Sequence, residues 1–238
     1  MTQSAPGRAA FIVLEGIDGA GTTTQAQRLA ERIRGGNAKV LVTNQPSSGP
    51  VGSLVRLALT RRVVGAALHY HDPVAGVTNG HPTASPPNAV APESLDFRTM
   101  ALLFAADRMD HVAALVTPSL EQGRHVVCDR YLLSSLAYQG TEVEPEWILE
   151  INRFAPRPDV TIFLDLDVDE AMNRMRRSRW TRDVYENRDL QLAVRDRYHH
   201  SIARYGSQLG RIETLNAEFS ADEVERRVWG IISPLLSG

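Results

Sequence analysis

The sequence contains a single cysteine in 238 residues, Cys128, within the apolar run HVVCD. One thiol cannot form a disulfide within the chain, and a buried one fits a reducing compartment. No run of 18 apolar residues occurs, and the first ten residues, MTQSAPGRAA, lack the apolar core of a signal peptide. We therefore expect a soluble, cytoplasmic protein that does not enter a membrane.

Strong charge of either sign is also lacking. The formal net charge is −2, and 23% of residues are charged while 43% are hydrophobic. This balance argues against a nucleic-acid-binding protein with a broad basic surface, and the apolar fraction supports a sizeable core rather than a disordered chain. The length suits one compact domain, so we expect a single domain over residues 1–238.

Short apolar runs alternate with patterns long enough for helices. This alternation predicts an α/β fold in which a parallel sheet carries helices on both faces. Ligands then bind beyond the carboxyl ends of the strands, so the residues after each strand are the candidates for function. The predicted strands are residues 11–15, 39–43, 125–129, 160–165 and 211–215.

Residues 63–94 fit neither pattern. The segment is rich in proline and glycine and has no helical period, which predicts a long inserted loop. His69, His71 and His81 within it suggest a metal site, but their spacing matches no common ligand pattern, and solvated histidines are the simpler interpretation.

A glycine-rich segment, EGIDGAGTTTQ, follows the first predicted strand. Its spacing approximates the phosphate-binding pattern G-x-x-x-x-G-K-[ST], in which backbone N–H groups and a helix N-terminus converge on phosphate. Thr23 stands where a hydroxyl meets Mg²⁺ in such loops, whereas Thr22 replaces the lysine. An ordinary strand–helix turn without a ligand is the alternative for this loop alone. The residues predicted to contact ATP phosphates are Gly16, Gly19, Ala20, Gly21, Thr22, Thr23 and Thr24.

Four segments in order carry a family resemblance. They are the loop EGIDGAGTTTQ, then LLFAADRMDHV (102–112), VVCDRYLLSSLAYQG (126–140) and RPDVTIFLDLDVDEAMNRMR (157–176). Together they closely resemble the thymidylate kinases, which are P-loop nucleoside monophosphate kinases. The resemblance covers nearly the whole chain except 63–94. It implies a P-loop kinase fold with a five-stranded parallel sheet, a lid, and transfer of the ATP γ-phosphoryl group to dTMP with Mg²⁺, giving dTDP and ADP.

Asp129 and Arg130 follow the strand HVVCD, so both should project into the ligand crevice. A carboxylate there can hold Mg²⁺ with Thr23 or orient the acceptor phosphate, and a guanidinium can donate twice to phosphate oxygens. A strand-end ion pair is the alternative. Asp18 lies inside the phosphate loop, and the resemblance implies that it binds the 3′-hydroxyl of the acceptor sugar rather than the phosphates.

Phe104 and Arg108 are four residues apart on a predicted helix and therefore share one face. The resemblance implies that Phe104 stacks on thymine and that Arg108 donates to a base carbonyl; a core phenylalanine and a surface arginine are the alternative. It also implies that Tyr138 packs against the deoxyribose and disfavours a 2′-hydroxyl. The remaining residues expected on the dTMP side are Arg130, Ser134, Ser135 and Gln139.

Five arginines fall within residues 174–186, RMRRSRWTRDVYE. A solvated basic helix end is one interpretation, and the resemblance implies a lid whose arginines stabilise the transferring phosphoryl group. We predict that the charge missing at Thr22 is supplied from this lid and that Thr22 is a neutral filler. The arginines expected to be catalytic are Arg176, Arg177, Arg179 and Arg182.

The sequence departs from the family at a second place. The bacterial pattern T-R-E-P-G after the second strand is here Thr43-Asn44-Gln45-Pro46-Ser47, which removes an arginine and a glutamate together. The function that we expect is an active thymidylate kinase, and two alternatives stay open: a kinase with a different acceptor nucleotide, and a nucleotide-binding protein without catalysis. The resemblance also implies a homodimer, for which the helix pattern at 95–117 is the candidate surface.

Overall fold

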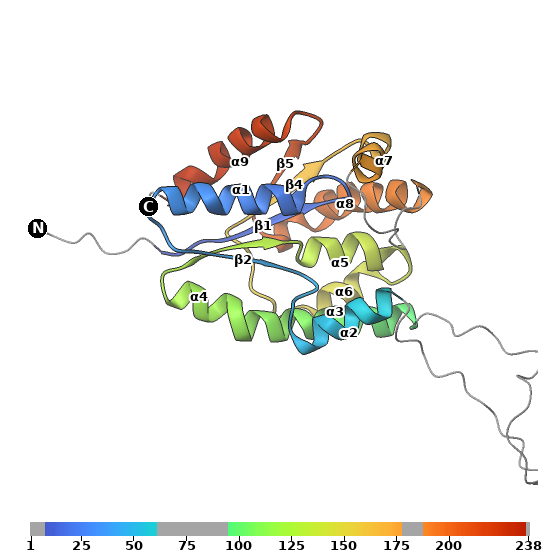
Figure 1. The fold of residues 1–238 in the computed structure, drawn as a ribbon. Coiled ribbons are helices and arrows are strands. Elements are labelled where there is room, and N and C mark those ends of the chain that lie inside the picture. The colour runs from blue at the N-terminus through green and yellow to red at the C-terminus, as the bar shows by residue number, and fades with distance from the viewer. Residues whose placement is uncertain (1–7, 61–94, 178–187, 237–238) are drawn as a thin grey trace, which may run out of the picture.

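A computed structural model describes residues 8–60, 95–177 and 188–236. Their strands form one parallel sheet in the order β2-β3-β1-β4-β5 (Figure 1), which confirms the predicted α/β class. Each observed strand begins and ends within one residue of its predicted bounds. The strands are β1 (Phe11–Gly16), β2 (Val40–Asn44), β3 (His125–Asp129), β4 (Val160–Asp165) and β5 (Ile212–Asn216).

Helices connect the strands. The first part of the chain contributes α1 (Thr22–Gly35), α2 (Pro50–Leu59) and α3 (Phe97–His111), which continues through one π-helical turn (Val112–Val116) into α4 (Thr117–Glu121). The second part contributes α5 (Leu132–Tyr138), a 3₁₀ turn (Gln139–Thr141), α6 (Pro145–Ile151), α7 (Val168–Arg177), α8 (Arg188–Leu209) and α9 (Ala221–Leu236). The predicted insertion at 63–94 and residues 178–186 of the predicted lid lie outside the described residues.

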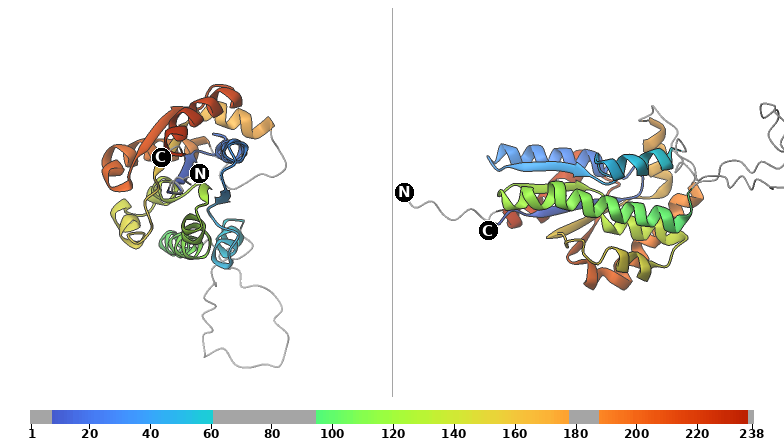
Figure 2. Two further views of the ribbon diagram at one scale, coloured as in Figure 1. Left: turned by 90° about the vertical axis from the view of Figure 1, so that its left-hand side faces the viewer. Right: turned by 90° about the horizontal axis from the view of Figure 1, so that it is seen from below.

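The helices cover both faces of the sheet. Helices α1 and α9 pack against each other on one face, while α4, α5 and α8 contact the strands from the other face (Figures 1 and 2). Strand β1 lies in the middle and is buried along its whole length, which explains why FIVLEG is an unbroken apolar run up to Glu15.

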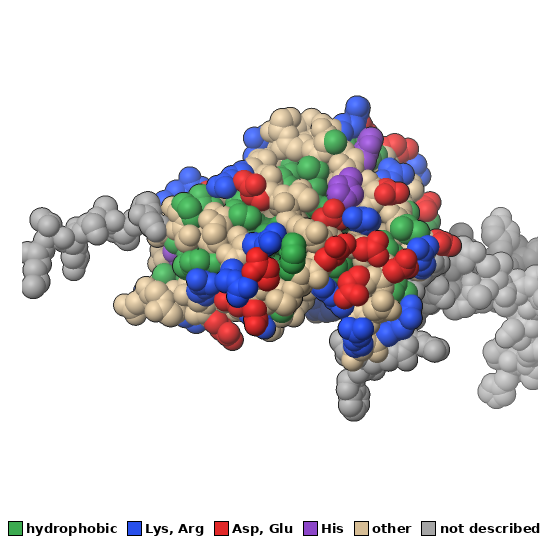
Figure 3. Space-filling model, turned by 90° about the horizontal axis from the view of Figure 1, so that it is seen from above, with side chains coloured by type: hydrophobic (Ala, Val, Ile, Leu, Met, Phe, Trp, Pro, Cys, Tyr) green, Lys and Arg blue, Asp and Glu red, His purple; other side chains and the backbone are tan. Residues whose placement is uncertain are grey.

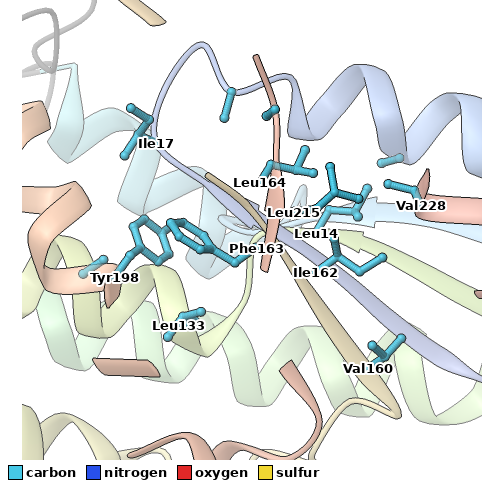
Figure 4. Packing of buried hydrophobic residues seen from close by; sticks show 14 of the residues in the cluster. Leu14, Ile17, Leu133, Val160, Ile162, Phe163, Leu164, Tyr198, Leu215 and Val228 are labelled. Atoms are coloured by element: carbon cyan, nitrogen blue, oxygen red, sulfur yellow. The ribbon is translucent and has the colours of Figure 1, made fainter. Parts of the chain in front are cut away.

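The largest apolar cluster lies between β1, β4 and the helices beside them. Phe163 of β4 stacks on Tyr198 of α8, with ring centroids 4.8 Å apart and an interplanar angle of 23° (Figure 4). Burying aromatic rings of this size contributes on the order of 2 kcal/mol each. This packing fixes α8 against the carboxyl half of the sheet, where β1 ends.

The surface carries both signs of charge. On the face seen from above in Figure 3, Lys and Arg side chains are interspersed with Asp and Glu side chains. Among the described helices, none combines the length and the apolar character needed to span a bilayer.

The strand register brings three candidate segments to one edge of the sheet. Leu14 of β1 pairs with Asp129 at the end of β3, and Gly16 pairs with Leu164 of β4. The loop after β1, the Asp129–Arg130 pair after β3 and the start of α7 after β4 therefore surround one region, as expected for ligand sites in parallel sheets.

Candidate functional site

The loop between β1 and α1 forms a phosphate-binding conformation. Gly19 and Gly21 have φ angles of 85° and 94°, in the left-handed region that favours glycine. A Cβ atom at Gly19 would lie 2.6 Å from the Ala171 carbonyl oxygen, so α7 packs directly on the loop. Helix α1 starts at Thr22 with its N-terminus facing the loop, which favours an anion there.

A large cavity opens over this loop. Six of the seven predicted phosphate-binding residues, Gly19 to Thr24, line it, and Gly16 ends β1 at the base of the loop. The cavity has a volume of about 740 Å³. Thr22 is 5% exposed, and its Cγ2 would lie 3.4 Å from a Cβ atom at Gly16. The threonine side chain therefore packs beneath the loop, as a neutral filler would.

Thr23, which lines this cavity, contacts Asp129 at the end of β3. The Thr23 hydroxyl donates a hydrogen bond to Oδ2 of Asp129, while Oδ1 is buried and has no hydrogen-bond partner among the described residues. A hydroxyl oxygen beside an orphaned carboxylate oxygen suits Mg²⁺, which prefers oxygen ligands and takes many of them from water and substrate phosphates. The described residues contain no cluster of three His, Cys, Asp or Glu side chains that could hold a metal by themselves.

Arg130 adopts a strained backbone conformation at the end of β3. Its φ angle of 69° is uncommon for a residue with a side chain. Its Nη1 donates to the Gly16 carbonyl oxygen at 2.6 Å, and its Nη2 donates to Oδ1 of Asp18 at 2.6 Å. Burial lowers the pKa of Arg130, but Tyr138, Asp18 and other neighbours raise it by more than burial lowers it. The net pKa lies above the usual value, so the guanidinium stays charged. The strain is offset by these bonds, which aim the cation at the phosphate loop.

A second, smaller pocket adjoins the phosphate cavity, and Asp18 and Arg130 line both. Its volume is about 120 Å³. All eight residues predicted for the dTMP side line this pocket: Asp18, Phe104, Arg108, Arg130, Ser134, Ser135, Tyr138 and Gln139. Residues from the phosphate loop, α3 and α5, distant in sequence, therefore share one surface.

The side chain of Arg108 is buried, with 1% of its surface exposed. It donates to Oε1 of Gln45 at 3.0 Å, to the Tyr131 carbonyl oxygen at 3.0 Å, to Oγ of Ser135 at 2.7 Å and to Oδ1 of Asn152. Burial lowers the pKa of Arg108. A guanidinium has five N–H groups, so four bonds fix its orientation and leave one donor for the pocket.

Gln45, at the position where the family pattern has glutamate, continues this network. Its Nε2 lies 3.1 Å from Nδ1 of His111, whose Nε2 lies 2.6 Å from Oγ1 of Thr43. Because Gln45 accepts from Arg108 with its oxygen, its nitrogen donates to His111, which makes Nδ1 an acceptor and Nε2–H the donor to Thr43. Burial lowers the pKa of His111, which keeps the ring neutral.

The serines of the pocket are bound to structural partners. The Ser134 hydroxyl donates to Oε2 of the buried Glu15, which also accepts from the Tyr198 hydroxyl at 3.1 Å. Burial raises the pKa of Glu15, against the lowering effect of the Ser134 hydrogen bond and of Arg130. Ser135 accepts from Arg108, so both serines position neighbours.

Several residues at the two pockets were missed by sequence reasoning. Gln191 of α8 is buried and contacts Asp18, and nothing in its sequence context indicates this. Phe219 and Arg174 line the phosphate cavity; Arg174 belonged to the basic lid motif but was not among the arginines chosen as catalytic. Gln45, Pro46 and Leu59 line the acceptor pocket, and only the departure from the family pattern drew attention to Gln45 and Pro46.

The structure describes only the first residues of the predicted lid, 174–177. Arg176 and Arg177 are exposed at the end of α7, and Arg179 and Arg182 lie outside the described residues.

Comparison with known proteins gives consistent matches over nearly the full length. A family model described as thymidylate kinase matches residues 14–70 and 88–228. A probable thymidylate kinase of Thermococcus kodakarensis is 37% identical over 228 residues, which cover 95% of this chain and 98% of the relative. One from Methanocaldococcus jannaschii is 33% identical over 223 residues, 93% of this chain and 95% of the relative. A thymidylate kinase of Thermomicrobium roseum is 32% identical over 232 residues, 95% of each chain.

Proposed function

The chain belongs to the thymidylate kinase family, and we propose that it transfers the γ-phosphoryl group of ATP to dTMP, giving dTDP and ADP. The observation that carries this proposal is the pair of adjoining pockets, one over the phosphate loop and one lined by all eight predicted acceptor residues. Because Asp18 and Arg130 line both, a donor and an acceptor bound there would meet beside these two side chains.

The base end of the acceptor pocket fits thymine. Arg108 has one N–H beyond its four structural bonds, and the side-chain oxygen of Gln139 is buried without a hydrogen-bond partner among the described residues. Thymine presents a carbonyl acceptor at O4 beside an N–H donor at N3, which match these two groups. Cytosine reverses both, so it would leave buried polar groups unpaired at a cost of about 1–3 kcal/mol each. Phe104 lines the same pocket and would stack on the ring.

The sugar end contains Asp18 and Tyr138. Asp18 carries a carboxylate oriented by Arg130 and Gln191, and it can accept a charge-assisted hydrogen bond from the 3′-hydroxyl. Tyr138 lies beside Arg130, with its hydroxyl 3.3 Å from Nη1. A ribose 2′-hydroxyl would meet this ring, which favours deoxyribose.

The phosphates of both substrates would meet between the loop and Arg130. The loop amides and the N-terminus of α1 bind the ATP phosphates, and Arg130 donates to the acceptor phosphate. Mg²⁺, held by Thr23 and Asp129, would neutralise charge on the phosphate oxygens. The lid, residues 174–186, supplies further positive charge to the transferring group, with Arg176, Arg177, Arg179 and Arg182 as the proposed donors.

The test is a coupled assay of ADP release with a panel of monophosphates. We expect the highest kcat/KM with dTMP, a lower value with dUMP, and much lower values with dCMP and UMP. A maximum with another monophosphate would reassign the acceptor. Binding of ATP without ADP release for any acceptor would mean that the chain binds nucleotide without catalysis.

We also propose that the active protein is a cytoplasmic homodimer that associates through α2 and α3. These two helices pack together and expose large apolar side chains, among them Leu54, Leu57 and Leu102. Light scattering should give twice the mass of one chain, and Leu102→Glu should give a monomer. A monomeric parent protein would refute this assembly.

A further inference from the structure

Arg108 is a buried cation whose hydrogen-bond partners among the described residues are all neutral. Its guanidinium donates to the side-chain oxygens of Gln45, Ser135 and Asn152 and to the carbonyl oxygen of Tyr131. These oxygens belong to amide, hydroxyl and carbonyl groups, which carry no charge. The ring of Tyr131 lies beside the guanidinium, with its centroid 5.1 Å from Cζ. Buried charges are normally paired with an opposite charge, so this shell leaves the cation uncompensated.

The nearest carboxylates are occupied by other groups. Asp107, which precedes Arg108 on α3, accepts from the backbone N–H of Ser47 at 2.8 Å and from its hydroxyl at 2.5 Å. Glu15 of β1 accepts from the backbone N–H of Tyr131 at 2.8 Å. Burial lowers the pKa of Arg108 by more than the acidic groups around it raise the pKa. The acidic groups therefore act on the guanidinium from a distance and do not replace a direct ion pair.

The absence of an ion pair follows from one residue, Gln45. The family pattern places a glutamate at this position, and Oε1 of Gln45 accepts from Nε of Arg108 at 3.0 Å. Gln45 is 5% exposed, and its Nε2 lies 3.1 Å from Nδ1 of His111, which fixes the orientation of the amide. A glutamate of the same shape would place a charged oxygen beside Arg108. The glutamine keeps the hydrogen bond and removes the negative charge.

The charge acts on the acceptor nucleotide, because Arg108 and Gln45 both line the acceptor pocket. The one N–H of Arg108 that is free of structural bonds is on Nη1. In the function proposed above it donates to O4 of the base, and Gln139 contacts N3. A base that loses its N3 proton spreads negative charge over O4, N3 and O2. A hydrogen bond to an ionised partner is roughly twice as strong as a neutral one, so such a base supplies the counter-ion that the protein lacks.

The other side of the base can accommodate either protonation state. The Gln139 side chain has an oxygen that accepts from N3–H and an N–H₂ group that, after rotation of the amide, donates to an ionised N3. Neither state of the base then leaves an unmatched group at Gln139. The charge of Arg108 is therefore the feature of the base end that distinguishes the two states.

We propose that Gln45 determines specificity: by leaving Arg108 without a carboxylate partner, it makes the pocket favour deoxyuridine monophosphates with an acidic N3–H, such as those with a halogen at C5. This rests on the proposed function. A halogen at C5 withdraws electrons from the ring and so makes N3–H more acidic. When such a base binds, the N3–H bond breaks and the proton passes to solvent. The electron pair stays on the ring, where O4 shares its charge and accepts from Arg108.

The experiment measures dissociation constants by calorimetry, without turnover, for two pairs of acceptor nucleotides matched in size. Bromine resembles a methyl group in size and fluorine resembles hydrogen, so dTMP is paired with 5-bromo-dUMP, and dUMP with 5-fluoro-dUMP. The pH range from about 7 to about 8.5 lies above the titration of an ordinary histidine. At its upper end the halogenated member of each pair should bind about tenfold more tightly, because an ionised partner doubles the strength of the hydrogen bond. The advantage should shrink toward pH 7.

Three variants separate the charge of Gln45 from its hydrogen bond. Gln45→Glu places a carboxylate beside Arg108 and should remove most of the preference for the halogenated nucleotides. It is also made together with His111→Gln, so that a proton taken up by the ring cannot cancel the new charge. Gln45→Met removes the hydrogen bond without adding charge, and should weaken all the nucleotides while keeping the preference. The exposed Gln208→Glu is the control for the charge change, and thermal melting verifies folding.

Equal affinities within each pair in the parent protein would overturn the proposal, even if Gln45→Glu does not fold. A preference that Gln45→Glu leaves unchanged, alone and with His111→Gln, would also overturn it. So would a loss of preference in Gln45→Met as large as in Gln45→Glu, because the hydrogen bond rather than the charge would then be responsible. If the parent binds these nucleotides but releases no ADP with any of them, the proposed function fails, and the ratios of the dissociation constants still decide the role of Gln45.

Discussion

Gln191, which is distant in the sequence, binds both the carboxylate and the backbone N–H of Asp18. Its Nε2 lies 3.0 Å from Oδ2 of Asp18, and its Oε1 accepts from the Asp18 backbone N–H at 3.3 Å. Gln191 is fully buried in the first turn of α8, which begins at Arg188, directly after the undescribed residues 178–187. The helix that follows the predicted lid therefore orients a proposed acceptor-binding group.

We predict that Gln191→Leu raises KM for dTMP by about tenfold with a smaller effect on kcat. A charge-assisted hydrogen bond contributes about 1.5–3 kcal/mol, and a misoriented Asp18 would lose part of that contact with the 3′-hydroxyl. The decisive comparison is 3′-deoxy-dTMP, which lacks the hydroxyl. Its KM should respond much less to Gln191→Leu; an equal increase for both acceptors would show that Gln191 does not act through Asp18.

Asp129→Asn should lower kcat by orders of magnitude while ATP affinity changes little. The asparagine keeps the shape and can still accept from Thr23, but it removes the negative charge that the orphaned Oδ1 offers to Mg²⁺. The parent activity should vanish with a chelator and return with Mg²⁺. Asp196→Asn, an exposed carboxylate of α8, is the matched control. A fully active Asp129→Asn protein would remove Asp129 from the metal site.

Tyr138→Ala should reduce the preference for dTMP over its ribose counterpart. In the parent, a 2′-hydroxyl that clashes or stays unpaired costs about 1–3 kcal/mol, and the tyrosine ring is the group that would meet it. The measurement is the ratio of kcat/KM for dUMP to that for UMP, which differ only at the 2′ position. A ratio near unity in the parent, or a ratio unchanged by Tyr138→Ala, would refute this role.

The fold was predictable from the sequence because the three central strands, β3, β1 and β4, are buried on both faces. Runs such as HVVCD and VTIFLD have no polar alternation, and their ends coincide with charged residues at the carboxyl edge of the sheet. The acceptor residues were predictable for a different reason: the resemblance assigned Phe104, Arg108 and Tyr138 together, and all three line one pocket.

Contacts between distant segments were not predictable. Nothing local to Gln191 indicates that it reaches Asp18, because the contact joins α8, whose Tyr198 packs on Phe163 of β4, to a loop 173 residues earlier in the chain. The burial of Arg108 was not predicted either. Its four partners come from three separate segments of the chain, and the sequence pattern on α3 shows only that Arg108 shares a face with Phe104.

The stability of the fold should depend on pH through His111. Its pKa is lowered by burial and by Arg108, against the raising effects of Asp107 and Asp110. Below about pH 6.5 the unfolded chain binds a proton that the folded protein excludes, so the free energy of unfolding falls as pH falls toward the folded pKa. The stability that neutral His111 contributes is therefore fully present above about pH 6.5 and is lost progressively as the pH falls to the folded pKa.

His111→Gln should flatten this part of the curve, because the amide can bond to Thr43 and Gln45 without titrating. Denaturant unfolding from pH 7.5 to pH 5 measures the slope for parent and variant. Some pH dependence should remain in the variant, because burial also lowers the pKa of His125. Glu15, whose pKa is raised by burial, contributes in the opposite direction above about pH 4.5. The exposed His200→Gln is the matched control. An identical slope in parent and His111→Gln, even if the variant is less stable at every pH, would show that His111 is not the group whose protonation the fold resists.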